Sequence, residues 1–150
     1  MKIIQIRHFQ TGAVVTSNNT RALDDNIPTT ANLTTDLMTL SIPPSHIANK
    51  LKIDIIFTGD VATGAGHSVL ALFQDAIANA LACSGMDTSD GFIKNIKLTH
   101  YMVAGTTSTT TFKVRAGSSN GGTLTMNGEG GNRKYGGVMA SSITITEYEG

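Results

Sequence analysis

A glycine-rich run near the end of the sequence is the first segment whose residue types could support chemistry. Seven glycines lie between Gly121 and Gly137. A phosphate-binding loop needs glycines at fixed spacing between a strand and a helix, or the P-loop pattern that ends in Lys-Ser/Thr. Neither pattern is present, and the run is followed by the β-branched, alternating segment VMASSITITEY. The run therefore predicts turns with positive φ in SSNGGT and MNGEGGN, and no stabilisation by nucleotides.

Histidine and aspartate side chains supply the other candidates for chemistry. The histidines lie at positions 8, 46, 67 and 100, without a spacing that binds zinc locally. His67 precedes Ser68, but a hydrolase nucleophile requires G-x-S-x-G, and neighbouring strand residues point to opposite faces. Asp24 and Asp25 precede Asn26, which favours a turn over a calcium or acid–base site. We expect no enzyme, and no catalytic, cofactor-binding or metal residues.

Length, charge and cysteine content narrow the class of protein. The chain has 150 residues, which predicts one domain over 1–150. Its formal net charge is zero, so neither nucleic acid nor an acidic membrane is an expected partner. Neither a membrane span nor a signal peptide is expected. The single cysteine, Cys83, lies in the apolar run AIANALACSG and predicts a buried free thiol.

Short alternating segments separated by Gly, Pro, Asn and Asp predict an all-β chain with almost no helix. NKLKIDIIFTGD is the clearest strand, because Leu51, Ile53, Ile55 and Phe57 alternate with polar residues and predict a core face. HSVLALFQDAIANALACSG is interpreted as two strands, or as one strand and an irregular piece. The range 16–35 predicts a surface loop. The strand spacing indicates an antiparallel β-sandwich or jelly roll. The other expected strands are KIIQIRHF, LMTLSI, FIKNIKLTHYMVAG, TTTFKVRAG, GTLTMNG and SSITITEYEG.

Several segments in the same order resemble a family of small β-sandwich domains in tailed-bacteriophage virion proteins and prophage tail regions. These are LDDNIP, LSIPPSHIANKLKIDI, LALFQDAIANALA, TTTFKVRAG, GGTLTMNG and GGVMASSITITEYEG, which together span roughly residues 23 to 148. The resemblance implies a jelly roll like that of tumour necrosis factor, usually a homotrimer on the virion surface. It implies no catalytic residues. The sequence shows no N-terminal coiled coil or collagen-like repeat, which argues against a long fibre.

The low charge content supports a homotrimer independently, because half-apolar strand faces outnumber what one core requires. Candidate interface residues oppose the core-facing sets on their strands: Leu70, Leu72, Tyr101 and Tyr148. The charged residues of the glycine-rich run, Glu129, Arg133 and Lys134, predict either an exposed loop that contacts a partner or a solvated hairpin tip.

The leading hypothesis is a non-enzymatic structural protein of a bacteriophage virion. It would be made in the bacterial cytoplasm and would lie on the virion surface, as capsid cement or decoration or as a short tail fibre or spike module for host attachment. Its partners would be itself, major capsid or tail proteins, and a host receptor or glycan. A lectin-like carbohydrate-binding domain is the alternative, although three Tyr and no Trp supply few rings for sugar stacking. A cupin-like or hydrolytic enzyme is the third.

Overall fold

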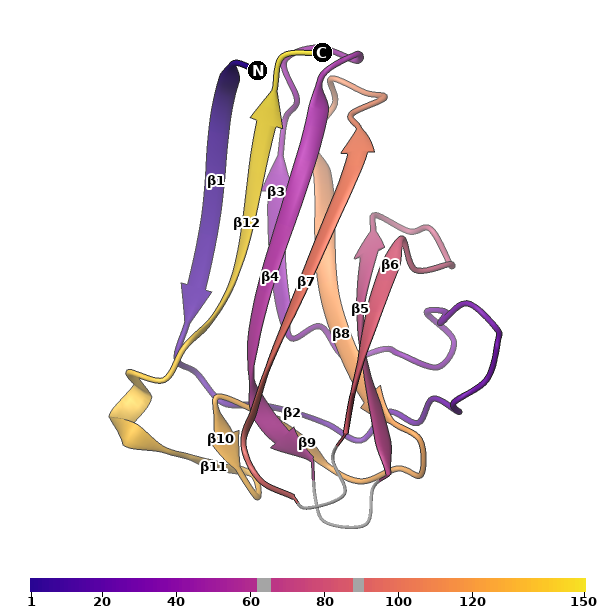
Figure 1. Ribbon diagram of the computed structural model, residues 1–150, viewed down its shortest axis with the longest axis vertical. Coiled ribbons are helices and arrows are strands. Elements are labelled where there is room, and N and C mark those ends of the chain that lie inside the picture. The colour runs from indigo at the N-terminus through magenta and orange to yellow at the C-terminus, as the bar shows by residue number, and fades with distance from the viewer. Residues whose placement is uncertain (62–65, 88–90) are drawn as a thin grey trace.

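The computed structural model describes residues 1–61, 66–87 and 91–150, and it forms an antiparallel β-sandwich of two sheets (Figure 1). Sheet A contains β1 (Ile3–Thr11), β12 (Ser141–Tyr148), β4 (Lys50–Val61), β7 (Lys94–Val103), β9 (Leu124–Met126) and β2 (Val15–Ser17). Sheet B contains β3 (Met38–Ile42), β8 (Thr110–Ser118), β5 (His67–Gln74) and β6 (Ala82–Asp87). A small hairpin is formed by β10 (Gly128–Glu129) and β11 (Asn132–Arg133). Within the described residues, helix is limited to the turn η1 (Tyr135–Gly137).

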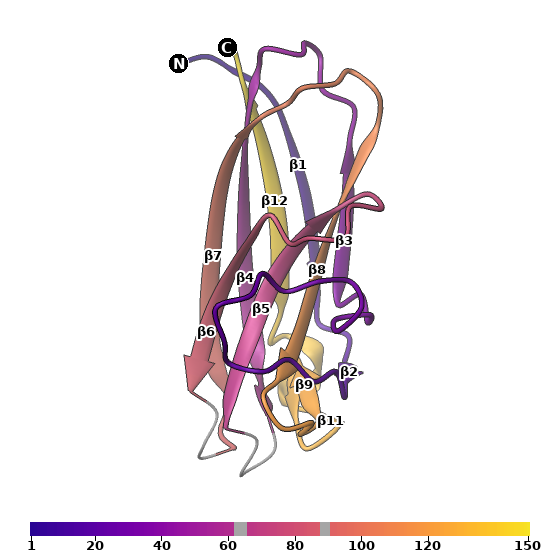
Figure 2. The same cartoon turned by 90° about the vertical axis from the view of Figure 1, so that its right-hand side faces the viewer.

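The strand order is jelly-roll-like. The long strands of sheet A lie in the order β1, β12, β4, β7, and those of sheet B in the order β3, β8, β5, β6. The chain therefore passes repeatedly between the sheets, and most neighbours in a sheet are distant in sequence. Figure 2 shows the two layers from the side. This arrangement confirms the expected all-β antiparallel sandwich, and the homotrimer stays a prediction.

The core lies between the sheets and is set by the alternation of β4. Ile53 and Phe57 are fully buried and Ile55 is 1% exposed, as predicted, whereas Ile56 on the other face is 41% exposed. β4 pairs with β12 on one side and β7 on the other, in an uninterrupted antiparallel register. Since successive side chains alternate between faces, the same strand gives sheet A one core face and one outer face.

We expect replacement of Ile53 or Ile55 by Asp to prevent folding, because an unpaired carboxylate in this core costs several kcal/mol. Ile56→Asp is the matched control on the same strand. Circular dichroism and soluble yield check the expectation. Equal melting curves for Ile53→Asp and Ile56→Asp would show that the assigned faces of β4 are wrong.

Strand β5 departs from the sequence interpretation because both of its faces are buried. Leu70 and Leu72 are 0% exposed and belong to the main core. Neither residue lies at a surface, so their assignment to a trimer interface is wrong. The opposite side chains, Ala71 and Phe73, are equally buried beneath Leu33, which comes from the loop that follows β2. This distant loop, and not a second copy, covers the face of β5 that carries Ala71 and Phe73. The strand is apolar on both faces for that reason.

The glycine-rich run turns strands, as predicted, although not every glycine acts through its φ angle. Gly121, Gly130 and Gly131 have φ of 80°, 59° and 81°. Gly128 has an ordinary φ, and the residue before it, Asn127, takes the left-handed conformation at 62°. Gly128 is needed for space instead, because a Cβ there would overlap the carbonyl oxygen of Asn132.

Gly121→Val and Gly128→Val should each lower the free energy of unfolding by about 1 to 3 kcal/mol, the first by backbone strain and the second by collision. Gly85→Val is the control, because its Cβ would lie 3.6 Å from the nearest atom, the carbonyl oxygen of Ser68. Urea denaturation measures all three. A loss no larger than that of Gly85→Val would contradict the turn assignment.

Candidate functional site

The outer face of sheet A carries a patch of exposed apolar and aromatic side chains near the chain ends. Two cross-strand rows build it: Ile3, Tyr148, Lys50 and Val103 form one, and Ile6, Thr146, Lys52 and Tyr101 form the next. We name Ile3, Ile6, Tyr101, Val103 and Tyr148 the outer-face patch. Tyr101 is 64% exposed, Ile6 57%, Val103 56% and Ile3 51%, and Tyr148 is half-buried.

Lysines lie between and beside the members of the outer-face patch. Lys52 lies 3.5 Å from Asp54 and places its Nζ 5.8 Å from the centre of the Tyr101 ring. The nearby Asp54 carboxylate raises the pKa of Lys52. Lys50 and Lys97 are exposed on the same face. Lysines thus outnumber acids on this face, and their long aliphatic stems can cover neighbouring apolar groups.

The sequence reasoning identified two residues of this patch and missed three. Tyr101 and Tyr148 lie in it, although no contact with a second copy is present to test their role. Ile3, Ile6 and Val103 were missed. Alternation along β7 places Val103 on the same face as Tyr101, but Ile3 and Ile6 are three residues apart, and a register shift between Ile3 and Gln5 brings both to this face. β1 is an edge strand, so its apolar content does not reveal which of its faces is covered.

The predicted partner-contact residues lie at the other end of the sandwich. Glu129 is half-buried in the β10–β11 hairpin, and Arg133 and Lys134 are exposed beside it. Figure 1 places this hairpin away from the two chain ends. The hairpin is tied to β4 by a hydrogen bond of 3.1 Å from the Gly130 amide to Asp60 Oδ2. Its role as a partner contact stays a prediction.

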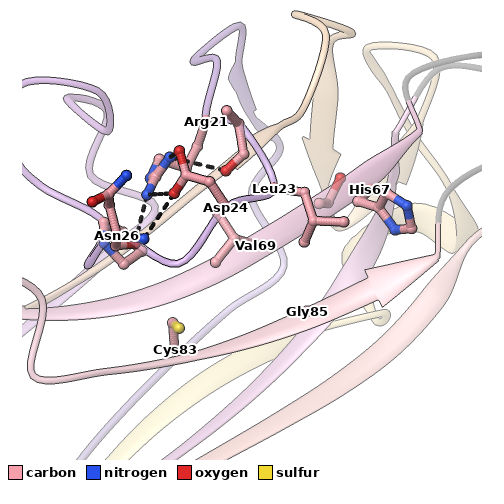
Figure 3. A pocket seen from close by; sticks show the side chains of 11 residues that line it. Arg21, Leu23, Asp24, Asn26, His67, Val69, Cys83 and Gly85 are labelled. Carbon is pink, nitrogen blue, oxygen red and sulfur yellow. Dashed lines mark hydrogen bonds and ion pairs between the residues drawn. The ribbon is translucent and has the colours of Figure 1, made fainter.

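A second candidate site lies under residues 21–28, which we name the arch. The arch passes over β5 and β6 and leaves a pocket of about 160 Å³ (Figure 3). A neighbouring hollow of about 380 Å³ shares Asp24, Asn26, Pro28 and Cys83 with this pocket. The two form one groove, and its walls are mostly apolar, with Leu23, Val69, Ile27, Leu81 and Ala82 among its residues.

Arg21 holds the arch in shape. Its guanidinium pairs with both carboxylate oxygens of Asp24, at 2.7 and 3.2 Å, and donates to the carbonyl oxygens of Ala22 and Asn26. The Arg21 side chain is 8% exposed and that of Asp24 is 39% exposed, so water reaches the carboxylate side of this pair. Hydrogen bonds from Arg21 and from the Asn26 amide lower the pKa of Asp24 well below its usual range. The bond from the Asn26 amide to Asp24 Oδ1 confirms the turn predicted for the two aspartates.

Cys83 lies in the groove and corrects the sequence interpretation. We expected a buried thiol, but Cys83 is exposed. It lies on β6, the edge strand of sheet B, where the arch leaves the groove open instead of closing over the strand. In the described part of the chain, no group of three or more His, Cys, Asp or Glu residues could hold a metal ion. No helix among these residues is long and apolar enough to cross a membrane.

The buried carboxylate of Glu147 fixes the end of sheet A that carries the outer-face patch. The sequence reasoning did not single out this residue. Glu147 is fully buried in β12. It accepts hydrogen bonds from Gln5 Nε2 at 2.6 Å, Asn49 Nδ2 at 2.7 Å, and both the amide and the hydroxyl of Ser45 at 2.8 and 2.9 Å. Burial raises its pKa, but these donors prevail and lower it from 4.5 to about 2.

Stability should therefore fall in acid through Glu147. Because its folded pKa lies below its unfolded value, its contribution is complete above about pH 4.5 and is lost as the pH falls towards 2. Glu147→Gln should melt at a lower temperature at pH 7 and show a smaller loss between pH 4.5 and 2. Glu149→Gln, which is exposed, is the control. Parallel pH profiles of melting temperature for wild type and Glu147→Gln would contradict this assignment.

The chain matches no protein-family model and no curated protein. Solved structures resemble it distantly. The C-terminal domain of EclA, a sugar-binding protein, gives a TM-score of 0.46 at 9% identity, covering 76% of this chain and 73% of that one. The native virion of Kashmir bee virus gives 0.32 at 10% identity, covering 98% and 70%. The VP2 subviral particle of infectious bursal disease virus gives 0.36 at 11% identity, covering 97% and 38%. No family is assigned from these likenesses.

Proposed function

We propose that the chain is a non-enzymatic structural protein of a bacteriophage virion surface, which assembles as a homotrimer through the outer-face patch. The observation that carries this proposal is the exposure of Tyr101, Val103, Ile6 and Ile3 on the outer face of sheet A, at the ends of two neighbouring cross-strand rows. The main core is built without them, from the other face of β4, β7 and β12. Large exposed apolar side chains that gather on one face of a sheet, and that the core does not use, mark an interface.

The ordered resemblance to virion β-sandwich domains supplies the biological setting, and the fold is consistent with it. A jelly-roll-like sandwich whose outer face combines exposed apolar side chains with lysines is suited to packing against another copy of the chain. A cyclic trimer uses this surface once in each chain, against a different surface of the next copy. As capsid decoration or as a short tail module, the trimer would leave the hairpin end free for other virion proteins or for the host.

We expect static light scattering to give three times the 15.7 kDa chain mass at micromolar concentration. Tyr101→Glu combined with Val103→Glu should shift the protein towards the monomer, because two carboxylates would then be buried in an apolar contact. Val138→Glu is the control, since Val138 is 86% exposed and lies outside the patch.

A wild-type monomer would refute assembly. A trimer that survives the double substitution but dissociates with Val138→Glu would refute the outer-face patch as its interface. Electron microscopy of a purified virion that displays the protein tests the location, and its absence from the surface of the particle would refute the virion role.

A further inference from the structure

We propose that the outer-face patch of one copy packs against the arch groove of the next copy, so that the assembly is head-to-tail. The inference rests on the proposed function, because it names the surface that the patch contacts. It assigns an interaction role to residues 21–28 and to the edge strand β6, of which Ala82 also packs against the main core.

The two surfaces carry opposite charge. The arch presents Asp24 and Asp25, of which Asp24 is already paired with Arg21, so the exposed Asp25 leaves an excess of negative charge. The outer face of sheet A presents Lys50, Lys52 and Lys97 against the single acid Asp54 at the paired positions of β4 and β7. A positive surface that meets a negative one favours association and fixes the orientation of the partners.

Their shapes and polarity also match. The outer-face patch projects large side chains, with Tyr101 64% and Val103 56% exposed. The arch groove is hollow and mostly apolar, and its lining includes Leu23 and Ile27, which are 72% and 56% exposed. Docking would cover apolar groups on both copies, and the Arg21–Asp24 pair keeps the groove open before a partner arrives.

The positions of the two surfaces make the contact head-to-tail. Figure 1 looks onto sheet A, with the arch at the right-hand side beyond β5 and β6, and the arch faces the viewer in Figure 2. The patch and the arch groove thus lie on different sides of one chain, so each copy offers one surface to each of two neighbours. Contacts of this kind close into a ring when the rotation between copies is suitable.

The single native cysteine makes a direct test possible. Cys83 lines the groove, so Tyr101→Cys places a second thiol on the opposing surface. Mild oxidation of this variant should give covalent dimers and trimers on a non-reducing gel. Tyr101→Cys in a Cys83→Ser background should give no covalent species. Val138→Cys, with Cys83 retained, is the position control and should stay uncrosslinked.

Covalent dimers that persist in the Cys83→Ser background would overturn the inference, because they join the thiols introduced at position 101 of two copies and show that the patches face each other. Absence of cross-links in a protein that light scattering shows to be a trimer would overturn it too. Both results leave the proposed trimer standing. A monomeric wild-type protein refutes the proposed function and this inference together.

A charge exchange provides an independent measurement. Lys50→Glu and Asp25→Lys should each weaken the trimer at least tenfold in dissociation constant, and the double variant should recover most of the loss. Equal loss in the double variant, or no effect of Asp25→Lys, would contradict the pairing of these surfaces.

Discussion

The register of β4 is the constraint on which the rest of the molecule depends. This strand pairs with β12, β7 and β9, and its alternation decides which face of sheet A meets the core. A slip of one residue would exchange the two faces and bury Lys52 in place of Ile53. The same alternation that closes the core therefore also lines up Tyr101 and Ile6 on the other face. The register of β4 thus determines both the core face and the outer-face patch of sheet A.

Buried polar groups hold this arrangement in place where strands end. Glu147 ties β12 to β1 and to the segment before β4, and no cation among the described residues pairs with it. At the other end, Asn127 donates to the carbonyl oxygens of Thr11 and Ala13 and accepts from the Ser141 hydroxyl. The Glu147 network fixes the end of sheet A that carries the outer-face patch, and the hydrogen bonds of Arg21 hold the arch.

Alternation of apolar and polar residues was sufficient to predict burial where a strand has one buried face and one exposed face. The core residues of β4 were predictable for that reason. The segment 67–85 was interpreted as two strands or as one strand and an irregular piece, and the structure has β5 and β6 there, but both faces of β5 are buried. Sequence alternation did not predict burial where a segment that is distant in sequence covers the strand. Leu33 covers β5, and Arg115 holds the loop that carries it by pairing with Asp36 at 2.7 Å and donating to the Leu33 carbonyl oxygen. The sequence of β5 and its neighbouring residues has no periodicity that indicates coverage by Leu33. The exposure of Cys83 was missed for the same reason, since it depends on the path of the arch.

Hydroxyl-radical footprinting of the unmodified protein tests the central claim most directly, because Tyr101 and Tyr135 form a matched pair. Both are highly exposed in the single chain, at 64% and 76%, but only Tyr101 lies in the outer-face patch. The account predicts that Tyr101 is strongly protected and that Tyr135 is labelled at the rate its exposure implies. Equal labelling of the two tyrosines at micromolar concentration would show that no second copy covers this face.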